Sequence, residues 1–215
     1  QRQMCIRDRC KESNADEVIV ITDSDEIFQH ISDLGGEAFI STTNHDSGTD
    51  RVQEYAKTAG LEAQEVVINV QGDEPLIDIE AVNQLGDFVH ANKYKYGTIA
   101  QHFSSNTDLL DPNKVKVVLN DDNSAIEFFR DAPIVVKDFS KVVLHHVGIY
   151  AYQVDFLHTF AGLSKTKNEL NLKLEQMRAL DNALPLHVLE LSLDESWGID
   201  TEEDLIRLRK HLELN

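Results

Sequence analysis

The first half of the chain alternates short apolar runs with segments of helical periodicity. Residues 17–22 (EVIVIT), 38–41 and 66–70 are runs of strand length, and the last fits a parallel strand covered on both faces. The segment 23–36 has apolar residues at helical spacing and ends in two glycines, which predicts a helix. A second helix is expected to begin in the polar loop NHDSGTDR, residues 44–51. Strands separated by helices predict a parallel sheet with right-handed βαβ connections.

The second half predicts a mixed sheet. Two runs of alternating polarity, residues 97–103 and 114–120, indicate strands, and the second leads into the turn residues 120–123. That turn predicts a hairpin with a strand at 124–129. Further along we expect a strand, an amphipathic helix, a last strand and a C-terminal helix at residues 145–152, 170–182, 186–193 and 204–212. Because no internal repeat, low-complexity tract or linker interrupts the pattern, residues 10–215 are predicted to form a single domain.

The third apolar run ends in two carboxylates, Asp73 and Glu74, followed by Pro75. Negative charge at the end of a buried strand is unfavourable unless a positive partner is present. Open α/β sheets bind ligands at the carboxyl ends of their strands, and Mg²⁺ takes carboxylate oxygens together with substrate phosphates. Asp73 is therefore a candidate metal ligand, with a plain turn residue as the alternative.

Composition and charge narrow the classes of partner. The 215 residues are 41% hydrophobic, and 20 Lys and Arg against 38 Asp and Glu give a net charge of −18. This charge repels nucleic acid and anionic membrane surfaces. No apolar run approaches the length of a membrane span, and the N-terminus has no apolar secretory segment, so we expect no membrane insertion and a cytoplasmic protein. Cys5 and Cys10 are expected to be free thiols.

Two later segments carry polar residues beside apolar ones. In the strand HHVGIYAY, alternation places His146 and Tyr150 on one face. In LEQMRAL, Glu175 and Gln176 are expected to point away from the buried apolar stripe of the predicted helix. By these patterns alone, histidines satisfied within the sheet and a solvated helix face are the ordinary interpretations.

Six motifs follow one another along the chain in an order that is typical of one enzyme family: HDSGTDR, INVQGDEP, NKVKVV, HHVGIYAY, LEQMRAL and GIDTEEDL. From about Cys10 to its end, the chain resembles the 3-deoxy-manno-octulosonate cytidylyltransferase family. The resemblance implies a Rossmann-like, glycosyltransferase-A-like α/β nucleotidyltransferase fold, with a mixed sheet flanked by helices. It also implies transfer of CMP from CTP to the sugar acid Kdo, with release of pyrophosphate, for lipopolysaccharide biosynthesis. Mg²⁺ as cofactor and a homodimer are expected on the same ground.

The resemblance gives roles to the acidic and nucleotide-side residues. It makes Asp73 and Asp200 the metal ligands and catalytic residues. For Asp200 a helix N-cap, with Glu203 three residues on, is the alternative, and both roles are compatible. The other substrate-contacting positions of the first half are Ser47, Gly48, Thr49, Arg51 and Gln71. For Ser47 and Thr49 an ordinary helix-start loop is the alternative, whereas Arg51 is one of few cations in an acidic chain that needs to meet a triphosphate.

The resemblance also assigns the sugar-acid side. It carries His146 and Tyr150 to the pocket for the sugar acid, and Glu175 and Gln176 to hydrogen bonds with the sugar hydroxyls. The family usually has Phe-Ser-Arg before its Pro-Ile, with the arginine reaching the sugar carboxylate. Here Arg130 stands one residue earlier and Asp131 occupies that slot. Because a one-residue shift in a strand turns a side chain to the other face, Arg130 is only a substitute candidate.

The beginning of the chain departs from the family. Family members start with a strand and a loop rich in glycine, arginine and lysine that wraps the triphosphate, whereas Cys10 matches a position near the end of the helix that follows. We therefore expect the first strand and phosphate loop to be missing, and residues 1–9 (QRQMCIRDR) to be foreign sequence with no helical or strand period.

Three alternatives remain open. The first is a cytidylyltransferase for another sugar acid, such as an amino-Kdo or a sialic acid, although HHVGIYAY and LEQMRAL favour Kdo. The second is an inactive, non-catalytic fragment that exposes an unpaired sheet edge. The third is a response-regulator-like receiver, suggested by VIVITDSDE, in which the later motifs have no place.

Overall fold

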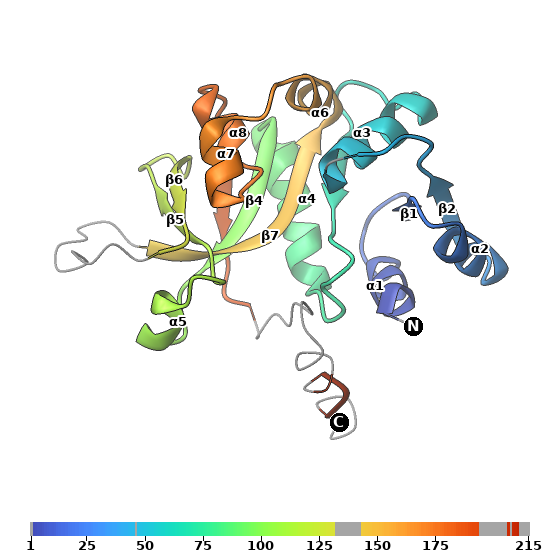
Figure 1. Cartoon of the computed structure of the whole chain (residues 1–215), viewed down its shortest axis with the longest axis horizontal. Helices are drawn as coiled ribbons and strands as arrows, with labels where there is room; N and C mark the ends of the chain where they lie inside the picture. The colour runs from blue at the N-terminus through green and yellow to red at the C-terminus, as the bar shows by residue number, and fades with distance from the viewer. Residues whose placement is uncertain (1, 46, 132–142, 194–205, 207, 211–215) are drawn as a thin grey trace. The chain divides into compact units, whose positions relative to one another are not determined.

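The computed structural model describes residues 2–45, 47–131, 143–193, 206 and 208–210. The chain forms two compact units. The first comprises Gln1–Ala59, Val70–Asn83 and Leu193–Asn215, and the second Gly60–Asn69 and Gln84–Ser192. Each unit is built from more than one segment of the chain, whose helices and strands are labelled in Figure 1, and the expectation of a single domain over residues 10–215 stays a prediction.

The first unit contains a two-stranded parallel sheet with helices beside it. Its elements are α1 (Arg2–Cys10), β1 (Ile19–Thr22), α2 (Asp25–Asp33), β2 (Glu37–Ile40) and α3 (Gly48–Ala59). The register runs from Ile19 opposite Glu37 to Thr22 opposite Ile40, so the predicted parallel pairing of the first two strands is confirmed. The Ser24 side chain caps α2 by accepting a hydrogen bond from the main-chain nitrogen of Ile27.

Helix α1 was not predicted from its sequence. Ile6 and Cys10 are buried, and Arg9 Nε donates to the carbonyl oxygen of Ile77 at 2.9 Å. Both partners of this bond belong to the first unit, so tertiary contacts stabilise a segment whose own residues carry no clear helical period. The expectation that residues 1–9 are foreign stays a prediction.

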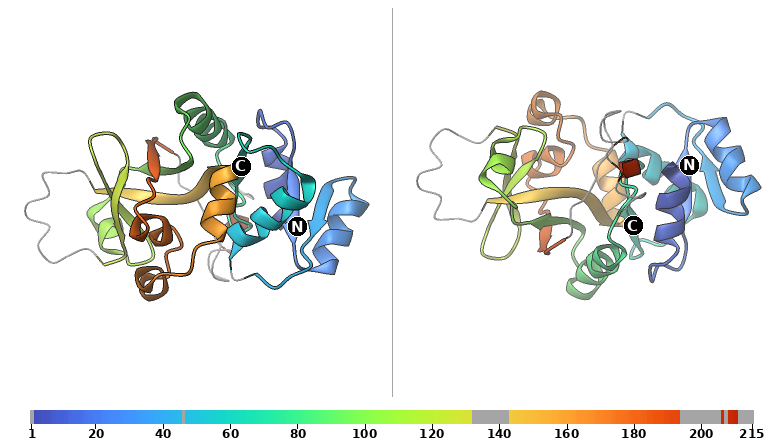
Figure 2. Two further views of the ribbon diagram at one scale, coloured as in Figure 1. Left: turned by 90° about the horizontal axis from the view of Figure 1, so that it is seen from above. Right: turned by 90° about the horizontal axis from the view of Figure 1, so that it is seen from below.

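The second unit contains a mixed six-stranded sheet. Its strands are β3 (Val66–Asn69), β4 (Tyr96–Gln101), β5 (Lys116–Leu119), β6 (Ala125–Phe129), β7 (Val143–Gln153) and β8 (His187–Glu190). The order is β6-β5-β7-β4-β8, and β3 pairs with the last residues of β7. The long strand β7 runs through this sheet and is recognisable in every view (Figure 2). The predicted β5–β6 hairpin and the mixed character of the sheet are confirmed.

Strand β3 corrects the parallel prediction for the first half. It pairs antiparallel with β7, from Val66 opposite Gln153 to Asn69 opposite Tyr150. Among the described pairings it has no parallel partner, and β1 and β2 form a separate sheet. The reason is the length of β7, whose eleven residues offer partners to three strands.

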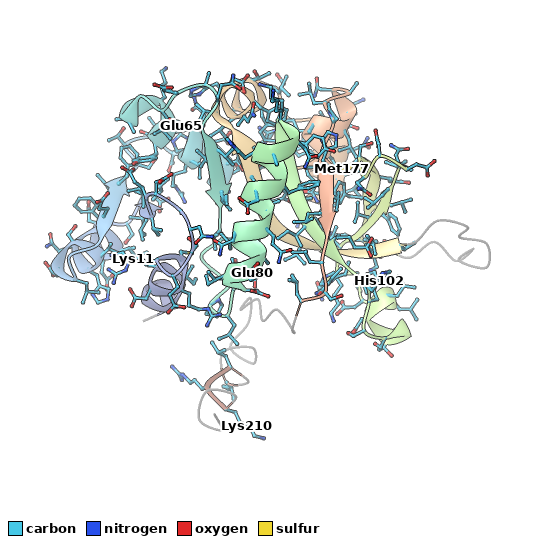
Figure 3. The ribbon with its side chains drawn as sticks, turned by 180° about the vertical axis from the view of Figure 1, so that it is seen from behind. Lys11, Glu65, Glu80, His102, Met177 and Lys210 are labelled. Atoms are coloured by element: carbon cyan, nitrogen blue, oxygen red, sulfur yellow. The ribbon has the colours of Figure 1, made fainter. Side chains whose placement is uncertain are left out.

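The predicted helix at 170–182 is two short helices. The helices of the second half are α4 (Ile79–Asn92), α5 (Asn106–Leu110), α6 (Val154–Ala161), α7 (Lys167–Leu172) and α8 (Met177–Asp181). Lys173 ends α7 with a left-handed backbone (φ 53°), so the helical pattern cannot run on. Met177, the first residue of α8, is buried in this unit (Figure 3).

The core of the second unit is rich in aromatic rings. Tyr96 stacks on Tyr152 and Phe156, with ring centroids 4.8 and 5.1 Å away, and Phe160 lies beside them. These side chains are almost fully buried, and contacts of this kind add to the area that they bury. In the part of the chain that the structure describes, no helix has the length and apolar character to cross a membrane.

Candidate functional site

The predicted nucleotide-side residues Ser47, Gly48, Thr49 and Arg51 lie at the start of α3, with Ser47 directly before the helix. Ser47 Oγ accepts a hydrogen bond from the main-chain nitrogen of Asp50 at 3.2 Å and donates to its carboxylate at 2.9 Å. Gly48 begins the helix, and Thr49 is buried. Ser47 thus acts as a helix-capping residue, as the alternative interpretation held, and this leaves its nucleotide role as a prediction.

Arg51 is held at the carboxyl edge of the small sheet. Its Nη2 donates to Asp23 Oδ2 at 2.6 Å, and Asp23 directly follows β1. The Nε of Arg51 is buried and has no hydrogen-bond partner among the described residues. Because a guanidinium has five N–H donors, Asp23 orients Arg51 without using up its capacity to bind an anion.

Gln71 and Asp73 lie in the turn that follows β3. The turn is closed by weak main-chain hydrogen bonds, from Glu74 to Gln71 at 3.4 Å and from Ile77 to Glu74 at 3.3 Å. Gln71 is exposed and Asp73 half-buried. Within the described residues, no group of three or more His, Cys, Asp or Glu side chains is placed to hold a metal. Asp200, the other predicted ligand, lies outside the described residues.

Asp73 nevertheless fits a magnesium ion by its chemistry. Mg²⁺ is usually bound by one or two carboxylates, with water and substrate phosphates completing the shell, rather than by a cage of protein ligands. One half-buried carboxylate in a strand-end turn supplies the protein oxygen that such a site needs.

In the second unit, His146 and Tyr150 lie together on β7. Their ring centroids are 5.5 Å apart, so the prediction that they share a face is confirmed. Thr98 Oγ1 lies 3.0 Å from His146 Nε2, and the carbonyl oxygens of Ile149 and Val147 lie 2.7 and 3.2 Å from the same hydroxyl as acceptors. Because two carbonyl oxygens accept from the Thr98 hydroxyl, the geometry favours a His146 tautomer that carries its proton on Nε2 and donates to Thr98.

Gln176 contradicts the expected solvated helix flank. It is only 2% exposed, because it lies in the turn between α7 and α8 rather than along one helix. Tyr150 donates to Gln176 Oε1 at 3.1 Å, and Gln176 Nε2 has no hydrogen-bond partner among the residues that the structure describes. Glu175 is half-buried beside it. The result is a buried polar cluster of His146, Tyr150 and Gln176 with an amide donor to offer.

An ion pair missed by the sequence analysis holds this turn. Arg178 Nε and Nη2 donate to the two carboxylate oxygens of Glu169 at 2.9 and 2.5 Å, and both side chains are buried. The guanidinium also lies 4.7 Å from the centroid of the Phe160 ring. Glu169 closes a capping box with Thr166 at the start of α7. The spacing Thr166-x-x-Glu169 is the sequence signature of this capping box, whereas the partner Arg178 has no such signal.

Arg130 donates to main-chain carbonyls from all three of its nitrogens. The acceptors are Leu172 at 2.8 Å, and Pro112 and Lys173 at 3.3 Å each. Arg130 thus braces the chain just before LEQMRAL, while its own carbonyl accepts from the buried Lys116 at 2.6 Å. A contact between Arg130 and the sugar carboxylate stays a prediction.

Burial keeps His146 neutral, and this predicts a pH dependence of stability. Desolvation, with a smaller contribution from His145, lowers the pKa of His146 from 6.5 to about 3. Because the unfolded chain takes up this proton first, the stabilisation is complete above about pH 6.5 and is lost as the pH falls toward 3. We expect the free energy of unfolding to fall by up to about 1.4 kcal/mol per pH unit from this residue.

Urea titrations between pH 7 and 4.5 measure this slope. His145, whose burial lowers its pKa to about 4, adds to the slope of the native chain, so the test is the difference between native and His146→Gln chains. His90→Gln, at an exposed position of α4, is the matched control. Equal slopes in all three chains would contradict a neutral, buried His146.

Comparison with known proteins places these residues in a family. The cytidylyltransferase family model matches residues 4–189, beginning inside the nine residues expected to be foreign. A 3-deoxy-manno-octulosonate cytidylyltransferase of Saccharophagus degradans is 36% identical over 96% of this chain and 86% of its own. The enzyme of the same name from Trichlorobacter lovleyi is 40% identical over 90% and 81%.

A solved structure gives the same assignment. The structure described as CMP:2-keto-3-deoxy-manno-octonic acid synthetase complexed with CTP superposes with a TM-score of 0.88 at 28% identity. It covers 99% of this chain and 88% of that one. The α/β nucleotidyltransferase fold predicted from the sequence is thereby confirmed. The chain belongs to the cytidylyltransferase family and, within it, to the 3-deoxy-manno-octulosonate cytidylyltransferases.

Proposed function

We propose that the chain transfers CMP from CTP to the anomeric hydroxyl of Kdo and releases pyrophosphate, a step of lipopolysaccharide biosynthesis. The observation that carries the proposal is the buried polar cluster of the second unit in a chain of this family. Tyr150 donates a hydrogen bond to Gln176 Oε1. The amide nitrogen of Gln176, which is a donor, has no acceptor among the described residues. Burying an amide N–H without an acceptor is unfavourable, so a ligand that accepts this hydrogen bond would be stabilised here.

The chemistry of the cluster suits a sugar acid with several hydroxyls. His146 is neutral, Tyr150 retains its proton because burial raises its pKa well above 10.0, and Gln176 is an amide. Such groups donate to and accept from hydroxyls without bringing a charge. A site built to bond hydroxyls rejects analogues that lack them, because its buried polar groups would then stay unpaired.

In this proposal the first unit binds the nucleotide. Arg51, oriented by Asp23, contributes positive charge to the triphosphate, and the capped start of α3 at Ser47 and Thr49 frames the cytosine. Asp73 and Asp200 would hold Mg²⁺, which when bound neutralises charge on the α-phosphate and orients the attacking hydroxyl. The chain's own task is to position CTP and Kdo in line, since phosphoryl transfer depends mainly on positioning and charge.

The test is pyrophosphate release with CTP, Kdo and Mg²⁺. It compares the native chain with one in which residues 1–9 are replaced by a family-type strand and phosphate loop. Activity in either chain supports the proposed transfer of CMP, and activity only in the second supports the site assignment and the predicted need for that loop. Folded but silent chains would overturn the proposal in favour of the non-catalytic alternative.

The same assay decides the substrate. We expect a kcat/KM for Kdo at least about 10-fold above that for an amino-Kdo or a sialic acid, since one mismatched polar contact in a buried site is worth at least that factor. A higher kcat/KM for another sugar acid would mean that this sugar acid, and not Kdo, is the substrate.

A homodimer is proposed on the family resemblance. Analytical ultracentrifugation of the chain measures this oligomeric state directly.

A further inference from the structure

One carboxylate ties the loop after β2 to helix α3. Glu54 Oε1 accepts from the main-chain nitrogen of Thr42 at 3.3 Å and from its hydroxyl at 2.9 Å. Glu54 Oε2 accepts from the hydroxyl of Ser41, from His45 Nε2 at 2.6 Å and from the Thr43 hydroxyl at 3.4 Å. Four of the five residues from Ser41 to His45 therefore converge on one side chain.

The same loop is anchored at its two ends. The main-chain nitrogen of Ser41 donates to the carbonyl oxygen of Thr22, the last residue of β1, at 2.7 Å. Beyond His45, Ser47 caps the first turn of α3. The loop therefore starts at the carboxyl edge of the parallel pair β1–β2, the edge at which open α/β sheets bind ligands.

Glu54 has no oxygen left for a substrate or a metal. A carboxylate offers about four lone-pair sites, and five donors already surround this one. Hydrogen bonds from Ser41 and His45, followed by those from Thr42, lower the pKa of Glu54 to about 2, so the group is an anion at neutral pH. Its side chain is 17% exposed. Any effect of Glu54 on catalysis must therefore pass through the loop.

We propose that Glu54 is a positioning residue that holds the loop at residues 41–45 in the conformation that receives the cytidine nucleotide. This inference rests on the proposed function. The loop precedes Ser47, Gly48 and Thr49 in sequence. A loop that is already ordered before binding need not be ordered by the nucleotide, so no affinity is lost to that ordering. If removing the carboxylate leaves the competent conformation populated about one tenth of the time, apparent affinity falls about tenfold.

The variant Glu54→Gln keeps the shape and removes the charge. We expect the Kd for CTP, measured by calorimetry, to rise about tenfold and the Kd for Kdo to stay unchanged, whereas the urea midpoint falls because the variant removes the anion that five donors stabilise. Exchange of the Thr42 amide, followed by NMR, is expected to become about tenfold faster. Thr42→Val, an isosteric change that removes a single donor, is expected to raise the Kd for CTP about threefold. Glu26→Gln, at an exposed position of α2, is the matched control.

Each outcome is decisive. A selective loss of CTP affinity together with faster Thr42 exchange supports the positioning role. Unchanged CTP affinity with faster exchange overturns it, because a less ordered loop would then bind the nucleotide as well as an ordered one. Parallel losses in CTP affinity, Kdo affinity and stability also overturn it in favour of a general structural role. A native chain that binds no CTP would mean instead that the proposed function has failed.

Discussion

Replacing Asp73 by asparagine is expected to lower the kcat of cytidylyl transfer by about 10³-fold, the largest effect of any single substitution. Asp73 is the described member of the proposed pair of magnesium ligands, in the turn after β3. A metal at a transferring phosphoryl group contributes several kcal/mol of charge stabilisation, and each 1.36 kcal/mol is a factor of ten in rate. Asparagine keeps the shape of the side chain and loses the anionic oxygen.

The measurement is steady-state pyrophosphate release over a range of Mg²⁺ concentrations. The Asp73→Asn chain is expected to require more Mg²⁺ for half-maximal rate and to keep its urea midpoint, because its carboxylate lies in a half-buried turn outside the core. Asp87→Asn is the control, since it makes the same chemical change at an exposed position of α4. A rate within tenfold of the native chain would show that Asp73 is not a metal ligand.

The largest expected effect on stability comes from Glu169→Gln. Arg178 and Glu169 are 2% and 8% exposed and are joined by two hydrogen bonds. Removing one partner of a buried ion pair leaves the other charge uncompensated, which costs about 3–5 kcal/mol. Glutamine keeps the capping geometry with Thr166 available, so the loss reports mainly on the ion pair.

Urea unfolding measures this loss, and two further chains interpret it. The double variant Glu169→Leu with Arg178→Met removes both charges and is expected to recover most of the stability, since apolar replacement of a whole buried pair is often neutral. Lys95→Met breaks the ion pair with Asp155, whose members are 43% and 38% exposed, and is expected to cost less than about 1 kcal/mol. Similar losses in Glu169→Gln and Lys95→Met would contradict the importance of burial.

Local patterns predicted the local elements well. Strands β1 and β2, helix α2 and the β5–β6 hairpin all follow from periodicity and turn residues. The shared face of His146 and Tyr150 also followed from alternation along one strand. These features depend on residues close together in sequence, which is the range that such patterns describe.

Errors arose where distant residues decide the outcome. The pairing of β3 with β7 joins segments more than eighty residues apart, and no periodicity within β3 reveals its partner. The break between α7 and α8 comes from a left-handed Lys173, a conformation that lysine adopts only when its surroundings impose it. Burial of Gln176 followed from that break, because the turn directs its side chain to Tyr150 instead of to solvent.

The sequence by itself determined the class of fold and which acidic and polar residues are candidates for the site. Through the order of its motifs it also determined the family. These properties depend on residue type and on spacing along the chain, both of which are given by the sequence alone. Only the tertiary structure decided that Glu54 gathers a loop around one carboxylate, that Arg178 is paired with Glu169, and that Gln176 meets Tyr150. The physical reason is that each of these contacts takes its energy from burial and hydrogen-bond geometry, which exist only once separate segments have been brought together.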